Sequence, residues 1–542
     1  MKTTDHYGSA RWAGQAERKR EGILDLPTDK VAAGGGDVRG SLLFGELADP
    51  GSLLRGIRQE TDGNFSTLAT KLGSVLPGGP GAQSLRTFLG WSGDGHVLTV
   101  APTRSGKGVG LVIPNLLHYG GSAIVVDPKG ENWAVTHRWR REALGQRTVC
   151  LDPFHAALPK GTPTDSINPL DGLVDYARGP ETYLEQNPEL LDEVGALADA
   201  IVVRPPDEKD PHWNDKCRTM IKGLLLAVVY GVGPGGRRHL SAVRAMLTGG
   251  LERLQGFWKY MQECRANADG VLARAAREIE SMGREEFKNV VSFALKQTEF
   301  LDSPLVEACL GGAGTEARGS FDLRGLKTGE AATVYLVLPS HYLAQYARLF
   351  RIWITMAMAA MTRTSGLPRG GRPVLFLLDE MAQLGTMDMM RKAVSLMAGY
   401  GMTLWMVWQD LSQLKALYKE DWQSFLANAK IQQYFGINDP ETAKTISEML
   451  GEETIRIETT SESTATSREN LSLFKGTKTR NTERSNAETA RALLMPDEVR
   501  RLPRETMLLF AQGMAPVACR RLSYYGDPAF AGRFDGNPYR RA

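Results

Sequence analysis

The segment 101–108, with the sequence APTRSGKG, constrains the fold of this chain more than any other stretch. It follows an apolar run at 96–100 and precedes an apolar segment at 109–117, so strand, glycine-containing loop and helix succeed one another. This is the local context of a phosphate-binding loop, in which backbone N–H groups at a helix start favour an anion. Lys107 would then reach the β- and γ-phosphates of a nucleotide.

The segment departs from the usual pattern G-x-x-x-x-G-K-[ST] at two positions. Ala101 stands where the first glycine is expected, and Gly108 stands where the Mg²⁺-binding hydroxyl is expected. Taken alone, the segment fits a nucleotide site and a tight turn between strand and helix equally well.

A pair of acids about 270 residues further on favours the nucleotide site. The apolar strand signal at 375–378 ends in Asp379 and Glu380, which is a Walker B pattern. Two carboxylates at the end of a buried strand favour a functional role, because an isolated buried carboxylate is costly. We expect Asp379 to hold Mg²⁺, directly or through water, and Glu380 to act as general base on the attacking water.

Gln409 follows the next predicted strand, at 403–408. A polar residue at the tip of the strand beside Walker B is placed to contact the γ-phosphate or the attacking water. Gln409 is therefore our candidate sensor, and a plain strand cap is the alternative.

Strand and helix signals alternate along much of the chain, which predicts an α/β fold with a mainly parallel sheet. The strand signals lie at 96–100, 122–126, 147–151, 332–338, 373–378, 403–408, 431–436 and 507–511. The carboxyl ends of parallel strands face the ligand crevice. Asp127, Lys129 and Asp152 follow two such strand ends. For Asp127 and Lys129, a functional role and a role in forming the turn are equally favoured. For Asp152, a role in the turn is favoured.

Strand signals disappear from about 180 to 311, where apolar residues recur at three- and four-residue spacing. The segments 190–201, 215–230, 240–246 and 271–301 carry this spacing, which predicts an inserted all-α domain. The expected division is an N-terminal lead-in at 1–90, the nucleotide-binding domain in two parts at 91–180 and 316–542, and the all-α domain at 181–315.

The segment 454–486 is rich in Ser, Thr, Glu and Arg. It fits either a mobile polar loop or an extended hairpin. The hairpin is favoured, because Thr and alternating charges suit strands that are exposed on both faces.

Composition excludes several classes of protein. The net charge is only +3 over 542 residues, so any nucleic-acid contact must come from local patches. Five dispersed Cys without a C-x-x-C pair argue for a reducing compartment and against a zinc site. No apolar run is long enough to span a bilayer, and the polar, basic N-terminus is not a secretory signal.

Together these motifs resemble the TraG-like type IV secretion coupling proteins, the ATPases of conjugation and related secretion systems. The segments that carry the resemblance are GSARWA at 8–13, APTRSGKGVGLVIPNLL at 101–117, SAIVVDPKGENW at 122–133, INPL at 167–170, LLDEMAQLG at 377–385, MVWQDLSQLK at 406–415 and ARALLMPDEV at 490–499. They cover nearly the whole chain, in order.

The resemblance implies a RecA-like P-loop domain interrupted by an all-α domain, and a homohexamer that binds ATP and Mg²⁺ between neighbouring subunits. It implies recruitment of a relaxase–DNA complex, or of a protein effector, to a type IV secretion channel, with transfer driven by ATP hydrolysis. By the same resemblance Asp379 and Glu380 serve Mg²⁺ and water, Gln409 is the sensor, and the nucleotide is bound by Thr103, Arg104, Ser105, Gly106, Lys107, Gly108 and Val109.

Three departures from the family pattern have consequences. Because Gly108 lacks a hydroxyl, the Mg²⁺ shell must be completed by Asp379, water or phosphate oxygens. The segment 398–401 lacks the arginine that some relatives supply in trans, which leaves Arg104, Arg324 and Arg491 as candidates. The family's transmembrane helices are absent from this sequence, so we expect either a truncated cytosolic portion, which we favour, or a naturally soluble member, acting at the cytoplasmic face of the bacterial inner membrane.

Two other functions fit the same motifs. One is a protein-substrate receptor, in which the helical domain docks secretion signals and ATP acts as a conformational switch. The other is an FtsK-like duplex translocase, which predicts a separate winged-helix module for which the sequence shows no segment.

Overall fold

The computed structural model describes residues 10–33, 38–47, 87–204, 211–236, 238–264, 270–311, 319–467 and 477–540. Its centre is a sheet of 12 strands in the order β1-β3-β2-β14-β13-β10-β4-β9-β8-β5-β7-β6. The strands from β10 to β6 pair in parallel. Their bounds are β10 Ala429–Tyr434, β4 His96–Val100, β9 Met402–Trp408, β8 Val374–Leu378, β5 Ala123–Asp127, β7 Ala332–Val337 and β6 Arg147–Leu151. The predicted mainly parallel α/β sheet is confirmed.

The other half of the sheet is antiparallel. It consists of β13 Thr506–Ala511, β14 Val517–Arg520, β2 Leu42–Leu47, β3 Thr87–Trp91 and β1 Ile23–Pro27. Three of these strands come from the first 91 residues, which the sequence indicated only as a loop-rich lead-in. Gly and Pro clusters around these short strands hide their pattern, and pairing with the sheet determines them instead.

Both faces of the parallel half are covered, as parallel sheets require. Alternate residues of β4 belong to different cores: Val97 packs into one cluster, and Leu98 and Val100 pack into the other. The helices around the sheet are α1 Gln15–Arg20, α2 Thr28–Ala33, α5 Ile113–His118, α6 Glu131–Glu142, α15 Gly325–Thr328, α16 Leu343–Thr362, α17 Asp388–Leu396, α18 Leu411–Tyr418, α19 Trp422–Asn428, α20 Pro440–Leu450 and α21 Pro496–Arg500.

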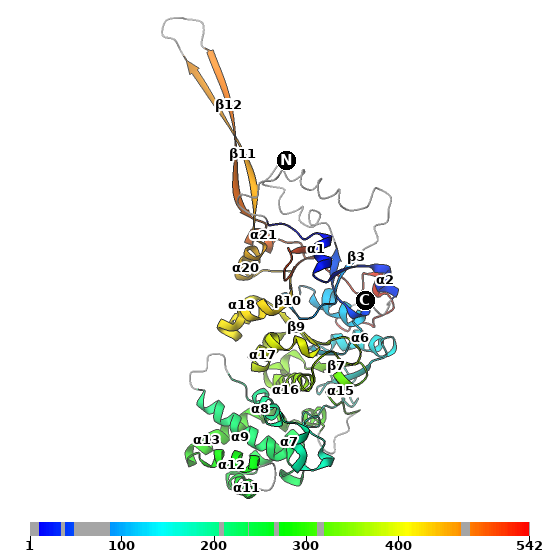
Figure 1. The fold of residues 1–542 in the computed structure, drawn as a ribbon, viewed down its shortest axis with the longest axis vertical. Coiled ribbons are helices and arrows are strands. Elements are labelled where there is room, and N and C mark those ends of the chain that lie inside the picture. The colour runs from blue at the N-terminus through cyan, green and yellow to red at the C-terminus, as the bar shows by residue number, and fades with distance from the viewer. Residues whose placement is uncertain are drawn as a thin grey trace.

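A group of helices lies between β6 and β7 in the chain and forms one end of the molecule (Figure 1). It comprises α7 Tyr183–Gln186, α8 Leu190–Ile201, α9 His212–Val229, α10 Leu240–Thr248, α11 Leu251–Glu263, α12 Val271–Glu280, α13 Arg284–Gln297 and α14 Pro304–Cys309. The segment 271–301 forms more than one helix, because Gly283 has extended dihedral angles (φ −62°, ψ 157°) and separates α12 from α13.

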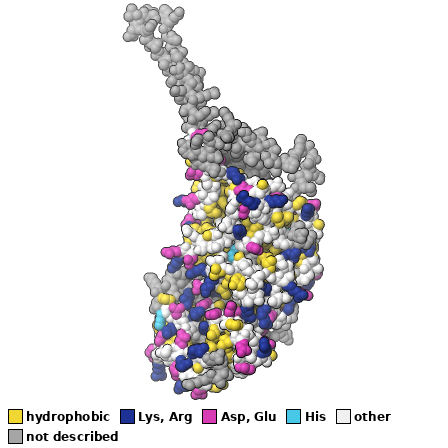
Figure 2. Space-filling model, in the orientation of Figure 1, with side chains coloured by type: hydrophobic (Ala, Val, Ile, Leu, Met, Phe, Trp, Pro, Cys, Tyr) yellow, Lys and Arg dark blue, Asp and Glu magenta, His cyan; other side chains and the backbone are white. Residues whose placement is uncertain are grey.

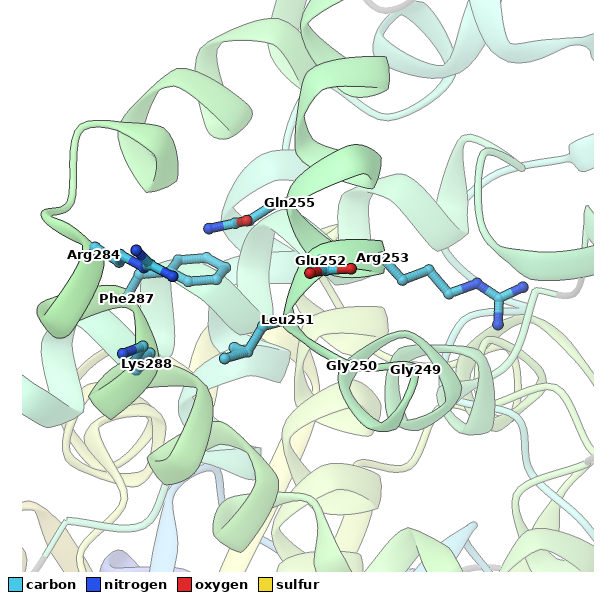
Figure 3. A pocket seen from close by; sticks show the side chains of 9 residues that line it. All are labelled: Gly249, Gly250, Leu251, Glu252, Arg253, Gln255, Arg284, Phe287 and Lys288. Atoms are coloured by element: carbon cyan, nitrogen blue, oxygen red, sulfur yellow. The ribbon is translucent and has the colours of Figure 1, made fainter.

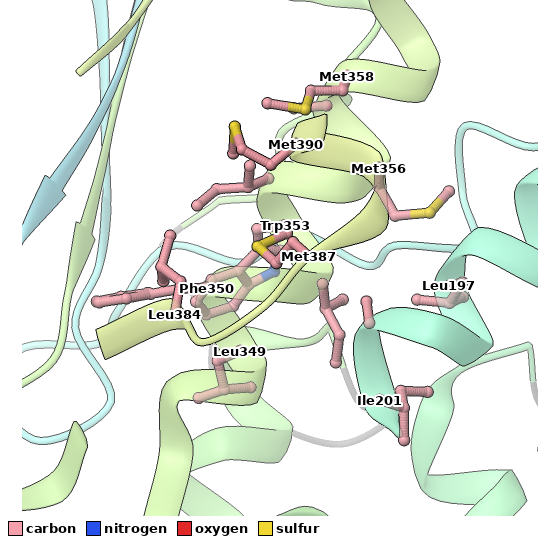
Figure 4. Packing of buried hydrophobic residues seen from close by; sticks show 14 of the residues in the cluster. Leu197, Ile201, Leu349, Phe350, Trp353, Met356, Met358, Leu384, Met387 and Met390 are labelled. Atoms are coloured by element: carbon pink, nitrogen blue, oxygen red, sulfur yellow. The ribbon is translucent and has the colours of Figure 1, made fainter. Parts of the chain in front are cut away.

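The helical group is fixed to the sheet through α8 and α16. Figure 4 shows Leu197 and Ile201 of α8 near the side chains of α16, among them Met356, and all three are buried. A separate cavity of about 520 Å³ lies at the start of α11 and is lined by Leu251, Arg284 and Phe287, among other residues of α11 and α13 (Figure 3). It contains none of the predicted site residues.

A long hairpin, β11 Glu452–Ser467 and β12 Thr477–Ala492, projects from the opposite end of the molecule (Figure 1). Its strands pair antiparallel from Glu452↔Ala492 to Ser467↔Thr477, which confirms the predicted hairpin. With 16 residues in each strand, the ribbon is about 50 Å long. Among the described residues, no helix is both long and apolar enough to cross a bilayer.

Candidate nucleotide-binding and catalytic site

The predicted site residues follow the carboxyl ends of three neighbouring strands. The strands β4, β9 and β8 are adjacent and parallel, with Val100 opposite Trp408 and Met406 opposite Leu378. The segment 101–108, Gln409 and the acidic pair therefore leave the sheet at one edge, as the sequence predicted. The strand β9 separates the loop strand β4 from the acidic strand β8.

The loop turns back on itself before the helix begins. The Ala101 N–H donates to the Trp408 carbonyl at 2.8 Å, which joins the loop to the tip of β9. Arg104 and Gly106 both have positive φ, 63° and 87°. A π-helical turn, Gly108–Val112, then leads into α5. Backbone N–H groups at the start of a helix that follows such a loop favour a bound anion.

Lys107 lies between the two carboxylates. Its Nζ is 2.7 Å from Glu380 Oε1 and 3.1 Å from Asp379 Oδ1. Gln409 Nε2 donates to the other Glu380 oxygen, Oε2, at 2.7 Å. The side chains of Lys107, Asp379 and Glu380 are 12%, 15% and 21% exposed, so the network is largely screened from solvent. The structure thus brings together all four residues predicted to perform the chemistry.

Burial and charge set the protonation of this network. Burial by itself lowers the pKa of Lys107, but the charges of Asp379 and Glu380 outweigh it and raise the pKa above its usual value. Burial raises the pKa of Asp379, with the Lys107 charge opposing it. Burial also acts to raise the pKa of Glu380, yet Lys107 and the hydrogen bond from Gln409 lower it overall. Glu380 is therefore ionised at neutral pH, as a general base must be.

Glu380 adopts a strained backbone conformation. Its dihedral angles are φ 58° and ψ 46°, the left-handed region that non-glycine residues rarely enter. Its carbonyl accepts a hydrogen bond from Gln383 N–H at 2.9 Å, within the turn that starts η9 Met381–Leu384. Such strain persists where surrounding structure imposes it and is concentrated at functional sites.

The other residues predicted at strand ends differ in what they contact. Asp127 is buried and accepts the Trp133 N–H at 2.9 Å, and burial raises its pKa to about 7. Asp152 accepts the N–H groups of Ala156, Ala157 and Leu158, which confirms the favoured turn. Lys129 acts at longer range, since its charge contributes to the lowered pKa of Glu380.

Two of the candidate arginines are engaged within the chain. Arg324 pairs with Asp322 at 2.5 Å, and Arg491 pairs with Glu498 at 2.7 Å. Arg104 lies exposed within the loop itself.

Sequence reasoning missed Arg521, which follows β14. Its Nη1 donates to the Ser105 carbonyl, and its Nε donates to the Arg504 carbonyl at 2.8 Å. A Cβ on Gly106 would lie 2.5 Å from the same Nη1, so the guanidinium packs directly against the loop. No local signal marks this residue, because 416 positions separate it from Ser105.

The residues present fit a nucleotide with Mg²⁺. The Ser105 hydroxyl is buried and has no hydrogen-bond partner within the part of the chain that the structure describes. Phosphate oxygens are suitable acceptors for such a donor. Asp379 and Glu380 offer the carboxylate oxygens that Mg²⁺ prefers.

Comparison with known sequences identifies the family. The profile of the type IV secretory system conjugative DNA transfer family matches residues 54–537. This chain belongs to that family. Among individual members, it is 29% identical to a conjugal transfer protein TraG of Escherichia coli, with 97% of this chain and 78% of that protein covered. It is 26% identical to protein VirD4 of Rhizobium radiobacter, over 97% of this chain and 65% of that protein.

Solved structures of a plasmid coupling protein share the fold. The plasmid coupling protein TrwB in complex with ADP and Mg²⁺ matches with a TM-score of 0.57 and 16% identity, over 90% of this chain and 97% of that chain. TrwB in complex with a non-hydrolysable ATP analogue matches with a TM-score of 0.56 and 16% identity, over the same shares of the two chains. The predicted RecA-like α/β fold is thereby confirmed.

Proposed function

We propose that this chain is the ATP-hydrolysing coupling protein of a type IV secretion system. It recruits a relaxase–DNA complex, or a protein effector, to the secretion channel and uses ATP hydrolysis to drive transfer. The observation that carries the proposal is the network in which Lys107 of the loop contacts Asp379 and Glu380 while Gln409 holds Glu380. The family, whose members are named for conjugal transfer, supplies the biological setting.

The network suggests how hydrolysis proceeds. Nucleotide phosphates compete for the Lys107 ammonium, which then leaves the two carboxylates for the loop, where residues 103–109 bind the phosphates. Asp379 becomes free to hold Mg²⁺, which neutralises developing phosphate charge when it is bound. Glu380 Oε1, vacated by Lys107, is the atom that accepts a proton from the attacking water, while Gln409 continues to hold Oε2.

The partners of this proposal follow the family pattern. A homohexamer would place each site between two subunits, and an arginine of the neighbouring subunit would reach the phosphates, with Arg104, Arg324 and Arg491 as the candidates. The assembly would act at the cytoplasmic face of the bacterial inner membrane. On the face shown in Figure 2, Lys and Arg are interspersed with Asp and Glu, so DNA contact would rely on local groups of charges.

We also propose the division expected from the sequence, with the nucleotide-binding domain at 91–180 and 316–542 and the all-α domain at 181–315. The helices α7 to α14 support it, since they follow one another without an intervening strand among the described residues.

The test is ATP turnover over a range of protein concentrations, with and without single- and double-stranded DNA. We expect turnover to rise cooperatively with concentration and with DNA in the wild type, and to be lost in Lys107→Ala. Lys288→Ala, a half-exposed lysine of α13, is the matched control and should behave as wild type. Nucleotide binding without any effect of DNA would favour the protein-substrate receptor, and absence of nucleotide binding would refute the proposal.

A further inference from the structure

Gly108 leaves a gap in the site where phosphate loops usually carry a hydroxyl. The backbone there is helical, and a Cβ built on Gly108 meets one heavy atom within 4 Å, Glu131 Oε2 at 3.9 Å. The carboxylate of Glu131 therefore lies beside the space that a Ser or Thr side chain at position 108 would enter.

The fold holds Glu131 in this place. The turn after β5 ends at Gly130, whose φ of 69° is accessible to glycine, and Glu131 is the first residue of α6. Asn537 Nδ2 donates to Glu131 Oε1 at 2.6 Å and to the Tyr524 hydroxyl at 3.0 Å. One carboxylate oxygen is thus fixed by the C-terminal segment, and the other faces the loop.

Other acids of the edge lie close to Glu131. The strands β5 and β8 pair in parallel with Val126 opposite Leu378, so Asp127 and Asp379 follow at the same level. The charges of Glu131 and Asp379 both act to raise the pKa of Asp127, so Asp127 lies within electrostatic reach of both carboxylates. Such a concentration of negative charge favours a cation.

We propose that Glu131 replaces the missing loop hydroxyl in the Mg²⁺ shell of the bound nucleotide, directly or through a bound water. The inference rests on the proposed ATP site and adds to it a residue from α6. It also explains how a loop with glycine at position 108 retains a complete set of oxygen donors, since Mg²⁺ keeps several waters and needs only one or two carboxylates.

The alternative role of Glu131 is structural. An acid in the first turn of a helix stabilises that helix through its dipole, and Glu131 occupies such a position in α6. The two roles differ in what they predict: loss of a purely structural group changes stability, whereas loss of a metal-shell group changes the dependence of nucleotide binding on Mg²⁺.

The experiment measures the affinity for a fluorescent ATP analogue as free Mg²⁺ is varied, and again in EDTA. In Glu131→Gln, which keeps an oxygen for Asn537, we expect the Mg²⁺ concentration for half-maximal effect to rise about tenfold or more. Affinity in EDTA should equal that of the wild type, which also shows that the variant is folded. Glu142→Gln, an exposed glutamate at the end of the same helix, is the control.

A second variant restores the donor by another route. Gly108 has room for a side chain, so adding Gly108→Ser to Glu131→Gln should bring the Mg²⁺ requirement back toward the wild-type value. An unchanged Mg²⁺ requirement in Glu131→Gln, with nucleotide still bound, would overturn this inference alone. A wild type that binds no nucleotide at all would overturn the proposed function together with it.

Discussion

Lys107 and Glu380, which are 273 positions apart in the chain, meet through a contact of 2.7 Å between Nζ and Oε1. In this arrangement the charge that should bind phosphate is neutralised by the group that should activate water. Under the proposed function, nucleotide binding and release of the base would be one event, because phosphate must take the lysine before Glu380 Oε1 is free. The site would stay inactive until the nucleotide is in place.

Substitution of Gln409 tests how Glu380 is positioned. Gln409→Ala removes the hydrogen bond to Oε2, and a hydrogen bond to a charged group is worth about 1.5–3 kcal/mol, so kcat should fall about tenfold to a hundredfold. KM should change little, since Gln409 does not hold Lys107. Steady-state kinetics measure both constants, with Gln262→Ala on α11 as the control. An unchanged kcat would show that Gln409 only caps the end of the strand.

Arg521 provides a test of the loop. Arg521→Ala removes the guanidinium that donates to the Ser105 carbonyl and packs beside Gly106, so the affinity for nucleotide should fall about tenfold, as for loss of one charged hydrogen bond. Arg520→Ala, the half-exposed neighbour, should have no effect. Equilibrium binding decides the matter, and equal affinities of the two variants would show that Arg521 does not shape the loop.

Two glycine-to-alanine substitutions distinguish a glycine that the backbone conformation requires from one that it does not. Gly106→Ala places a Cβ against Arg521 at a residue with φ 87°, so nucleotide binding should be lost and the protein should lose about 1–3 kcal/mol of stability. Gly256→Ala in α11 meets nothing within 4 Å and should gain about 1 kcal/mol. Denaturant unfolding measures both, and a stable, nucleotide-binding Gly106→Ala would contradict the described loop.

His96 makes stability depend on pH. Its Nδ1 accepts the Leu404 N–H at 3.2 Å and its Nε2 is 3.2 Å from the Ala393 carbonyl, an arrangement that only the neutral ring satisfies. Burial lowers the pKa of His96 from 6.5 to about 4. The unfolded chain binds this proton more readily, so stability is present above pH 6.5 and is lost as the pH falls toward 4.

The loss attributable to this one ring is about 3 kcal/mol between pH 7 and pH 4. Denaturant unfolding of the wild type and of His96→Gln over that range isolates it, because the variant should show a shallower decline. Parallel curves for the two proteins would mean that the ring does not titrate as described.

The sequence predicted the site residues that lie just beyond the carboxyl ends of the strands. Lys107, Asp379, Glu380 and Gln409 each follow an apolar run, and parallel strands bring such positions to one edge by topology alone. Arg521 could not be predicted from the sequence, because its contact with the loop depends on where the C-terminal segment crosses that loop. Glu131 lies in the segment 122–133, which carries part of the family resemblance, but its proximity to Gly108 depends on the turn at Gly130.

The edge strands and the helix boundary at Gly283 escaped prediction for a related reason. The strands β1, β2 and β3 are stabilised by pairing with one another and with β14 rather than by a long local pattern. The break between α12 and α13 depends on one glycine within a continuous helical period. Tertiary context decides both.

The most direct test of the account compares ATP binding and ATP hydrolysis in Glu380→Gln. The variant loses the base but keeps a side chain of the same shape, so it should bind MgATP at least as tightly as the wild type while turnover falls by about 10²-fold or more. Glu285→Gln, an exposed glutamate on α13, should leave both unchanged. Turnover in Glu380→Gln equal to that of the wild type would contradict the central claim that the loop at 101–108 and the acids at 379–380 form one hydrolytic site.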